Sequence, residues 1–216
     1  ESCLRGLMYD PTLAEAYSAL GFAYMSKKSI DEAISAGQKA IELDPNNFTG
    51  YWILGRLYHL TDRDRDAVEM HKKAIALNPN FHTAYGDLRT LYERLGDKQK
   101  HDEILQTLIE VYPRYLAQHP DDARSHIYYA IDLAHIGRKE EARVEAARAL
   151  ELSPGDSLMM YNAACFYARM GETKLALESL KNSIADGLED YEWIKRDVDF
   201  DSIRNEPEYI ELMKGK

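Results

Sequence analysis

The chain has 216 residues, of which 45% are hydrophobic and 30% charged, and its 37 acidic against 27 basic side chains give a formal net charge of −10. This acidic balance argues against a duplex nucleic acid or an anionic membrane as the main partner, since both repel an acidic protein. No run of 18 apolar residues occurs, so the sequence predicts no membrane-spanning helix.

A 34-residue period runs through most of the chain. Pro11, Pro45, Pro79 and Pro113 stand 34 residues apart, and Pro154 follows 41 residues later. A fixed period of this length is typical of stacked supersecondary units, none of which can bury its apolar face without a neighbour. The sequence therefore predicts one continuous stack, in which function belongs to a shared surface rather than to a single pocket.

Within each period, two apolar stripes with helical spacing follow each other. The first has the spacing i, i+3, i+4, i+7, and small residues in both stripes allow two helix backbones to approach closely. A proline then ends the second helix, because the residue before it leaves the α region and proline cannot continue the hydrogen-bond ladder. Each period is thus predicted to be a helical hairpin. In the first period the stripes are Tyr17, Leu20, Gly21 and Tyr24, followed by Ala33, Ile34, Gly37, Ala40 and Ile41.

The period also predicts where each unit begins and ends. The third unit is degenerate, its second helix is expected to be extended, and an insertion follows it. Residues 1–12 align with the end of a second helix, so we expect the chain to be a piece of a longer polypeptide. The predicted repeats are 14–47, 48–81, 82–115, 123–156 and 157–190, with the insertion at 116–122 and a terminal helical cap at 191–216.

Three successive periods share one pattern, in which Tyr17-x2-Leu20-Gly21-x2-Tyr24 is followed by its counterparts at 51–58 and 85–92. With the later alanines and the closing proline, this pattern resembles the tetratricopeptide repeat. The resemblance implies an all-α fold, a right-handed α-solenoid of antiparallel helix hairpins closed by C-terminal helices. It also implies a non-catalytic protein-interaction module that binds a peptide segment along the inner curve.

Helix periodicity assigns the remaining first-helix positions to that inner curve. They include Glu15, Ser18 and Ala19 in the first repeat and Thr49 and Ile53 in the second. Aromatic side chains would anchor a peptide, and arginines would bind carboxylates as bidentate pairs. We therefore expect an acidic or C-terminal peptide as the ligand. The candidate groove residues are Phe22, Trp52, Arg56, His59, Asp87, Arg94, Arg124, Tyr128, His135, Tyr161, Asn162 and Arg169.

Other interpretations of the same residues stay open. Phe22 and Trp52 could instead pack between repeats, with the arginines paired to nearby carboxylates such as Asp87. The chain could also associate with a second copy of itself through an apolar N-terminal end that contains Leu4, Leu7 and Met8. A third alternative is a regulatory or sensory role toward an enzyme on the same polypeptide.

Few motifs indicate chemistry. Asp197, Asp199 and Asp201, with Glu208 at the twelfth place, have the ligand spacing of a calcium-binding loop, but Ser202 replaces the glycine that such a loop needs. An acidic capping loop with Phe200 and Ile203 turned inward accounts for more of its residues. The histidines and the two cysteines, Cys3 and Cys165, have no metal or redox spacing. We expect no enzyme activity, no metal and no cofactor.

The C-terminal half carries a more specific resemblance. Segments 115–124, 161–168 and 193–204 resemble the repeat region of large bacterial signalling proteins, among them class III adenylate cyclases and receptor-type Ser/Thr kinases. The resemblance implies an effector domain upstream. It implies a cytoplasmic chain or, alternatively, an extracytoplasmic domain of a membrane-anchored protein.

Overall fold

The computed structural model describes residues 13–214, and within that range every regular element is helical. The predicted helix tail at 1–12, with Leu4, Leu7 and Met8, lies outside the described residues, as do 215 and 216. The chain divides into two compact units, residues 1–111 and 112–216, called here the N-terminal and C-terminal units. Within residues 13–214, no helix combines the length and apolar character needed to cross a membrane.

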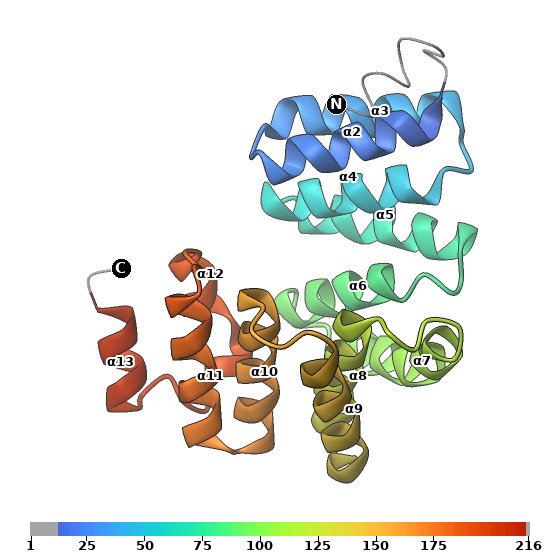
Figure 1. Ribbon diagram of the computed structural model, residues 1–216. Helices are drawn as coiled ribbons and strands as arrows, with labels where there is room; N and C mark the ends of the chain where they lie inside the picture. Colours follow the sequence, from blue (N-terminus) through green and yellow to red (C-terminus); the bar gives the residue numbers. More distant parts are fainter. Residues whose placement is uncertain (1–12, 215–216) are drawn as a thin grey trace. The chain divides into compact units, whose positions relative to one another are not determined.

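The N-terminal unit is a stack of helix hairpins (Figure 1). Helix α2 packs on α3 and α4 on α5, and first helices also contact each other, α2 with α4 and α4 with α6. The last helix, α7, is the longest and continues into the C-terminal unit, with Pro113 inside it. The helices are α2 (Ala14–Ser26), α3 (Ile30–Leu43), α4 (Phe48–Leu60), α5 (Asp64–Leu77), α6 (His82–Arg94) and α7 (Lys98–Leu116).

The C-terminal unit repeats the arrangement and ends in short helices. Helix α8 packs on α9 and α10 on α11, while α10 also contacts α8 and the 3₁₀ turn η1. The predicted all-α stack of antiparallel hairpins with closing helices is confirmed. The elements are α8 (Ala123–His135), α9 (Lys139–Leu152), α10 (Ser157–Met170), α11 (Thr173–Ala185), α12 (Tyr191–Arg196), η1 (Val198–Phe200) and α13 (Pro207–Met213).

Side-chain caps fix where several first helices begin. Asn47 precedes α4 and its Oδ1 accepts a hydrogen bond from the Gly50 amide at 2.8 Å. Asp122 and Asp156 cap α8 and α10 in the same way. Such caps satisfy amides that have no partner within the helix, so the polar residues after the helix-ending prolines also start the next helix.

A buried histidine packs against a glycine in the core of the N-terminal unit. A Cβ atom at Gly55 would lie 2.7 Å from the His71 ring, so only glycine lets the ring approach α4 this closely. His71 is 1% exposed, and neither ring nitrogen has a hydrogen-bond partner within the described residues. Burial lowers the pKa of His71 from 6.5 to about 4, so the ring is neutral at pH 7.

Candidate functional site

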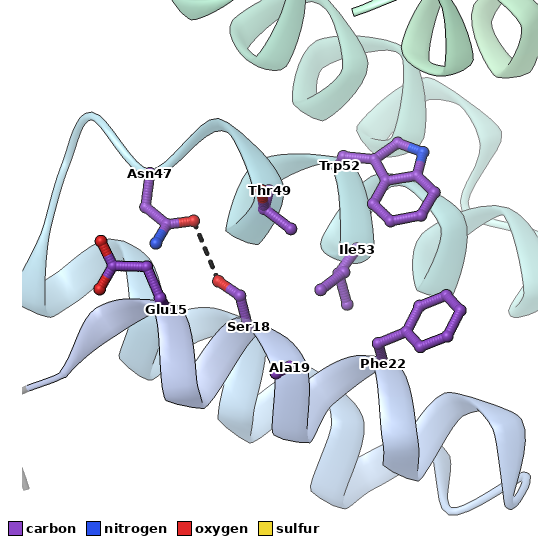
Figure 2. A pocket seen from close by; sticks show the side chains of 8 residues that line it. All are labelled: Glu15, Ser18, Ala19, Phe22, Asn47, Thr49, Trp52 and Ile53. Atoms are coloured by element: carbon purple, nitrogen blue, oxygen red, sulfur yellow. Dashed lines mark hydrogen bonds between the residues drawn. The ribbon is translucent and has the colours of Figure 1, made fainter. Parts of the chain in front are cut away.

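A cavity of about 310 Å³ opens between α2 and α4 in the N-terminal unit (Figure 2). Figure 2 shows the two helices running in the same direction past it, with polar side chains at one end and two aromatic rings at the other. We call it the α2–α4 cavity. It is lined by Glu15, Ser18, Ala19, Phe22, Asn47, Thr49, Trp52 and Ile53.

The aromatic end of the α2–α4 cavity is exposed yet ordered by contacts. Phe22 is 45% exposed and stacks on Trp52, with ring centroids 6.1 Å apart and an interplanar angle of 19°. Trp52 is held on its other sides, by an edge contact with Phe81 at 5.5 Å and by a hydrogen bond from its Nε1 to Asp87 Oδ2 at 2.7 Å. The rings therefore form a fixed apolar surface that water contacts.

The polar end of the α2–α4 cavity contains an amide whose orientation is fixed by its partners. Asn47 Oδ1 accepts from the Gly50 amide and from Ser18 Oγ, at 2.8 and 2.9 Å. Because both partners donate, the oxygen must face them, and Nδ2 is turned the other way. Within residues 13–214, Nδ2 makes no hydrogen bond, although Asn47 is only 7% exposed.

Two other predicted groove residues of this unit, Arg56 and His59, lie further along α4. The Arg56 guanidinium carbon lies 5.5 Å from the centre of the Trp52 ring, a cation–π geometry. His59 Nδ1 is 2.8 Å from Asp64 Oδ1. Arg56 thus extends the aromatic end with a positive charge, whereas His59, in the last turn of α4, contacts Asp64 at the start of α5.

Arg94 is half exposed and pairs with carboxylates in the turn between α4 and α5 and at the start of α5. Its guanidinium pairs with Asp62, and its Nε lies 2.8 Å from Asp64 Oδ2. Asp62 has a positive φ of 58° at the turn. Local pairing of arginines was one of the alternatives from sequence, and for Arg94 it is what the structure has, with partners in the preceding turn.

In the C-terminal unit, a later segment of the chain covers the corresponding helix face. Residues 197–203, called here the closing segment, pack on α10. Tyr161 donates its hydroxyl hydrogen to Asp197 Oδ2, and Arg169 donates from Nε to Asp199 Oδ1. Tyr161 is buried and Arg169 is paired, so neither offers a ligand the open side chain that the sequence suggested.

The closing segment is an integral part of the core. Phe200 is fully buried and meets Tyr161 edge-on, with centroids 5.6 Å apart, and Ile203 is 1% exposed. Burial, together with the neighbouring Asp199 carboxylate, raises the pKa of Asp197. Phe200 and Ile203 therefore turn inward, as in the capping loop expected from sequence.

The remaining predicted residues of the C-terminal unit do not gather around a cavity with Tyr161. Arg124 is exposed and Tyr128 is 38% exposed, both on α8, while Asn162 on α10 is partly buried. His135 Nδ1 lies 2.6 Å from Arg169 Nη1, and it accepts this hydrogen bond because a guanidinium can only donate. His135 and Arg169 also line a second cavity, of about 330 Å³, beside Asp199 and Ser202 of the closing segment.

One side-chain cluster within residues 13–214 has ligand atoms close enough to hold a metal ion. The atoms of Cys165, Asp197 and Asp199 lie within 4.8 Å of one another. Both carboxylates already accept hydrogen bonds from Tyr161 and Arg169, and burial raises the pKa of the Cys165 thiol, which disfavours the thiolate that binds metals. In the calcium-like motif, Asp201 likewise pairs with Arg204. These contacts stabilise the closing segment.

Comparisons with known proteins agree with this architecture. Residues 14–47 match the family model of the tetratricopeptide repeat. A thermophilic TPR protein of Thermus thermophilus is 19% identical, with a TM-score of 0.63 over 83% of this chain and 94% of that one. PilF of Pseudomonas aeruginosa is 17% identical, with a TM-score of 0.59 over 83% of this chain and 79% of that one. The chain therefore has a tetratricopeptide-type helical-repeat fold.

A curated relative matches part of the chain. A chloroplastic protein of Arabidopsis thaliana is 28% identical over an alignment of 101 residues that covers 45% of this chain. The matched region spans only 29% of that protein's length.

Sequence reasoning missed two parts of these surfaces. Asn47 is assigned no role from the sequence patterns, although an Asn directly before an apolar-periodic helix is a cap signal that could have placed it at the start of α4. The sequence also does not predict that Asp197 and Asp199 cover α10, because their partners Tyr161 and Arg169 are 36 and 30 residues away in the chain.

Proposed function

We propose that this chain is a non-catalytic protein-interaction module whose N-terminal unit binds an extended peptide segment of a partner protein in the α2–α4 cavity. The observation that carries the proposal is the exposed Phe22 ring stacked on the partly buried Trp52 ring at a cavity of about 310 Å³. An ordered aromatic surface in contact with water is typical of a binding site, since its burial by a ligand is favourable.

The rigid placement of Trp52 supports binding without a large ordering cost. Asp87 and Phe81 hold the indole before any ligand arrives, so little side-chain entropy is lost on binding. A peptide side chain entering beside Ala19 and Ile53 would cover both rings. A peptide is the proposed class of ligand because the cavity lies between two helices that run in the same direction, so an extended segment could lie along them (Figure 2).

The wider context is also a proposal. The resemblance of segments 115–124, 161–168 and 193–204 to the repeat regions of bacterial signalling proteins supports a cytoplasmic interaction module of a larger bacterial signalling or scaffolding protein. In such a protein the α2–α4 cavity would recruit a partner, and an attached effector would act on it.

Selection from a library of linear peptides displayed on phage tests this function on the whole chain. Peptides enriched on the wild-type chain should bind Phe22→Ala about tenfold or more weakly, because the variant loses half of the aromatic surface. Leu60→Ala is the matched control, since Leu60 is also an exposed apolar residue but does not line the cavity.

Circular dichroism establishes that both variants are folded. An absence of enriched peptides, or enriched peptides that bind Phe22→Ala and wild type equally, would rule out the cavity as the binding site.

A further inference from the structure

We propose that the α2–α4 cavity selects a peptide of mixed charge, with a basic residue at one end, an apolar side chain in the middle and an acidic residue at the other end. This inference rests on the proposed function and specifies its ligand. The ligand proposed here is not uniformly acidic, because Arg94 and Arg169, which would have bound its carboxylates, are already paired within the chain.

Opposite charges lie at the two ends of the cavity. Glu15 lines the polar end, and Arg56 lies over the Trp52 ring at the aromatic end. Both side chains are exposed, and neither forms an ion pair with any residue between 13 and 214. A ligand charge at either end would therefore gain a partner without breaking an existing one.

The length of the cavity along α2, from Glu15 to the aromatic end beside Arg56, sets the length of the ligand. Figure 2 shows Glu15 and Phe22 at opposite ends of the cavity along α2, seven residues apart. Seven residues of helix rise about 10 Å. An extended peptide covers the same distance in about three residues. The basic and acidic residues of the ligand should thus be three or four positions apart, with the apolar residue between them.

The middle of the cavity accepts one side chain. Its volume of about 310 Å³ is at the lower end of the range for ligand pockets, about 300–1,000 Å³. The small Ala19 and the buried Ile53 form its apolar floor between the two charged ends. One aliphatic or aromatic residue, rather than a folded element, suits this space.

Asn47 supplies a hydrogen-bond donor for the ligand backbone. Its Nδ2 is turned away from Gly50, has no partner within the described part of the chain, and lies on the Glu15 side of the amide in Figure 2. Because Nδ2 has no partner and is not fully buried, solvent reaches it beside the cavity, and an acceptor of the ligand can replace that water. A peptide carbonyl oxygen next to the basic residue would fill that role.

The experiment is a charge reversal of the cavity, Glu15→Arg with Arg56→Glu, which keeps the net charge. Peptides selected on the wild-type chain should share an apolar residue with a basic residue on one side and an acidic residue on the other. Peptides selected on the reversed variant should show the opposite order of charges. Each selected peptide should bind its own protein about tenfold better than the other at low salt, and the preference should shrink as salt is raised.

The matched control is Glu32→Arg with Arg65→Glu, two exposed residues that do not line the cavity and form no ion pair within residues 13–214. It should select the same charge order as the wild type. Peptides that need Phe22 but show no charge order, or the same order on both proteins, would overturn this inference and leave the proposed function standing. Peptides that do not need Phe22, or no selected peptides at all, would overturn both.

Discussion

The two units contain similar helix hairpins but differ in what faces the solvent on their first helices. In the N-terminal unit, the α2–α4 cavity leaves Phe22 and Trp52 in contact with water. In the C-terminal unit, the closing segment covers α10 and uses Tyr161 and Arg169 as internal partners. The same helix positions can therefore bind a ligand or bind the chain itself, depending on whether a later segment returns to them.

The covered face shows what chemistry such a surface favours. An acidic segment with one aromatic residue, Asp197 to Phe200, contacts an arginine, a tyrosine hydroxyl and the tyrosine ring on α10. These are the groups that the sequence suggested for an external ligand. The difference is that Phe200 is fully buried, so the closing segment contributes to folding as well as covering the face.

The largest expected effect comes from removing the aromatic anchor of the closing segment. Phe200→Ala should lower the free energy of unfolding of the C-terminal unit by about 3–5 kcal/mol, because a fully buried aromatic side chain is replaced by a cavity. Urea unfolding followed by Trp193 fluorescence measures it. Val198→Ala is the control, since Val198 is 44% exposed in the same segment and should cost little. A loss below about 1 kcal/mol would mean that the closing segment is only loosely attached.

The second prediction contrasts the acid response of the units. His71 has a pKa of about 4 in the folded chain against 6.5 as its ordinary value. Between these values the unfolded chain binds a proton that the folded chain does not, so stability should fall as pH drops from about 6.5 to about 4. The full loss is about 3 kcal/mol in the N-terminal unit.

Asp197 acts in the opposite direction. Its pKa is raised from 3.8, so above pH 3.8 the folded chain keeps a proton that the unfolded chain releases. The contribution of Asp197 to stability therefore falls as pH rises from 3.8 through its raised pKa. The two tryptophans separate the units, since Trp52 lies in one and Trp193 in the other. Urea midpoints at pH 4.5 and 6.5 in Trp193→Phe and in Trp52→Phe measure each response.

His71→Leu serves as the control for the acid response, because it removes the titrating ring from the N-terminal unit. Its Trp52 transition should lose most of the pH dependence. A wild-type Trp52 transition that stays constant over this range would contradict the burial of a neutral His71.

The smallest expected effect on stability is at Asn47. Asn47→Asp keeps the oxygen that caps α4 and removes the Nδ2 donors, so the free energy of unfolding should change by no more than about 0.5 kcal/mol. At high salt, which screens the attraction of the new carboxylate for the ligand's basic residue, peptides selected on the wild type should bind about two- to tenfold more weakly. Fluorescence titration measures this, with Asn162→Asp on α10 as the matched control. Equal weakening in both variants would indicate a general effect of added negative charge.

Much of the fold could be predicted from the sequence, because the period of the prolines and the Tyr17-Leu20-Gly21-Tyr24 pattern encode local structure that every repeat shares. Helix periodicity also indicates which side chains of α2 and α4 face the cavity. The partners of Arg94 and Arg169 could not be predicted, because they lie about 30 residues away in a turn and in the closing segment. Long side chains reach such partners only once the hairpins have stacked.

Asn47 connects recognition to the start of a helix. The same amide that fixes the first turn of α4 presents its nitrogen beside the cavity, so the donor is in place only while that turn is formed. Fraying of the first turn of α4 would then lower the affinity for a ligand, and a bound ligand would protect the amide hydrogen of Gly50 from exchange with solvent. Ligand occupancy should therefore be detectable as slowed exchange at a single backbone position.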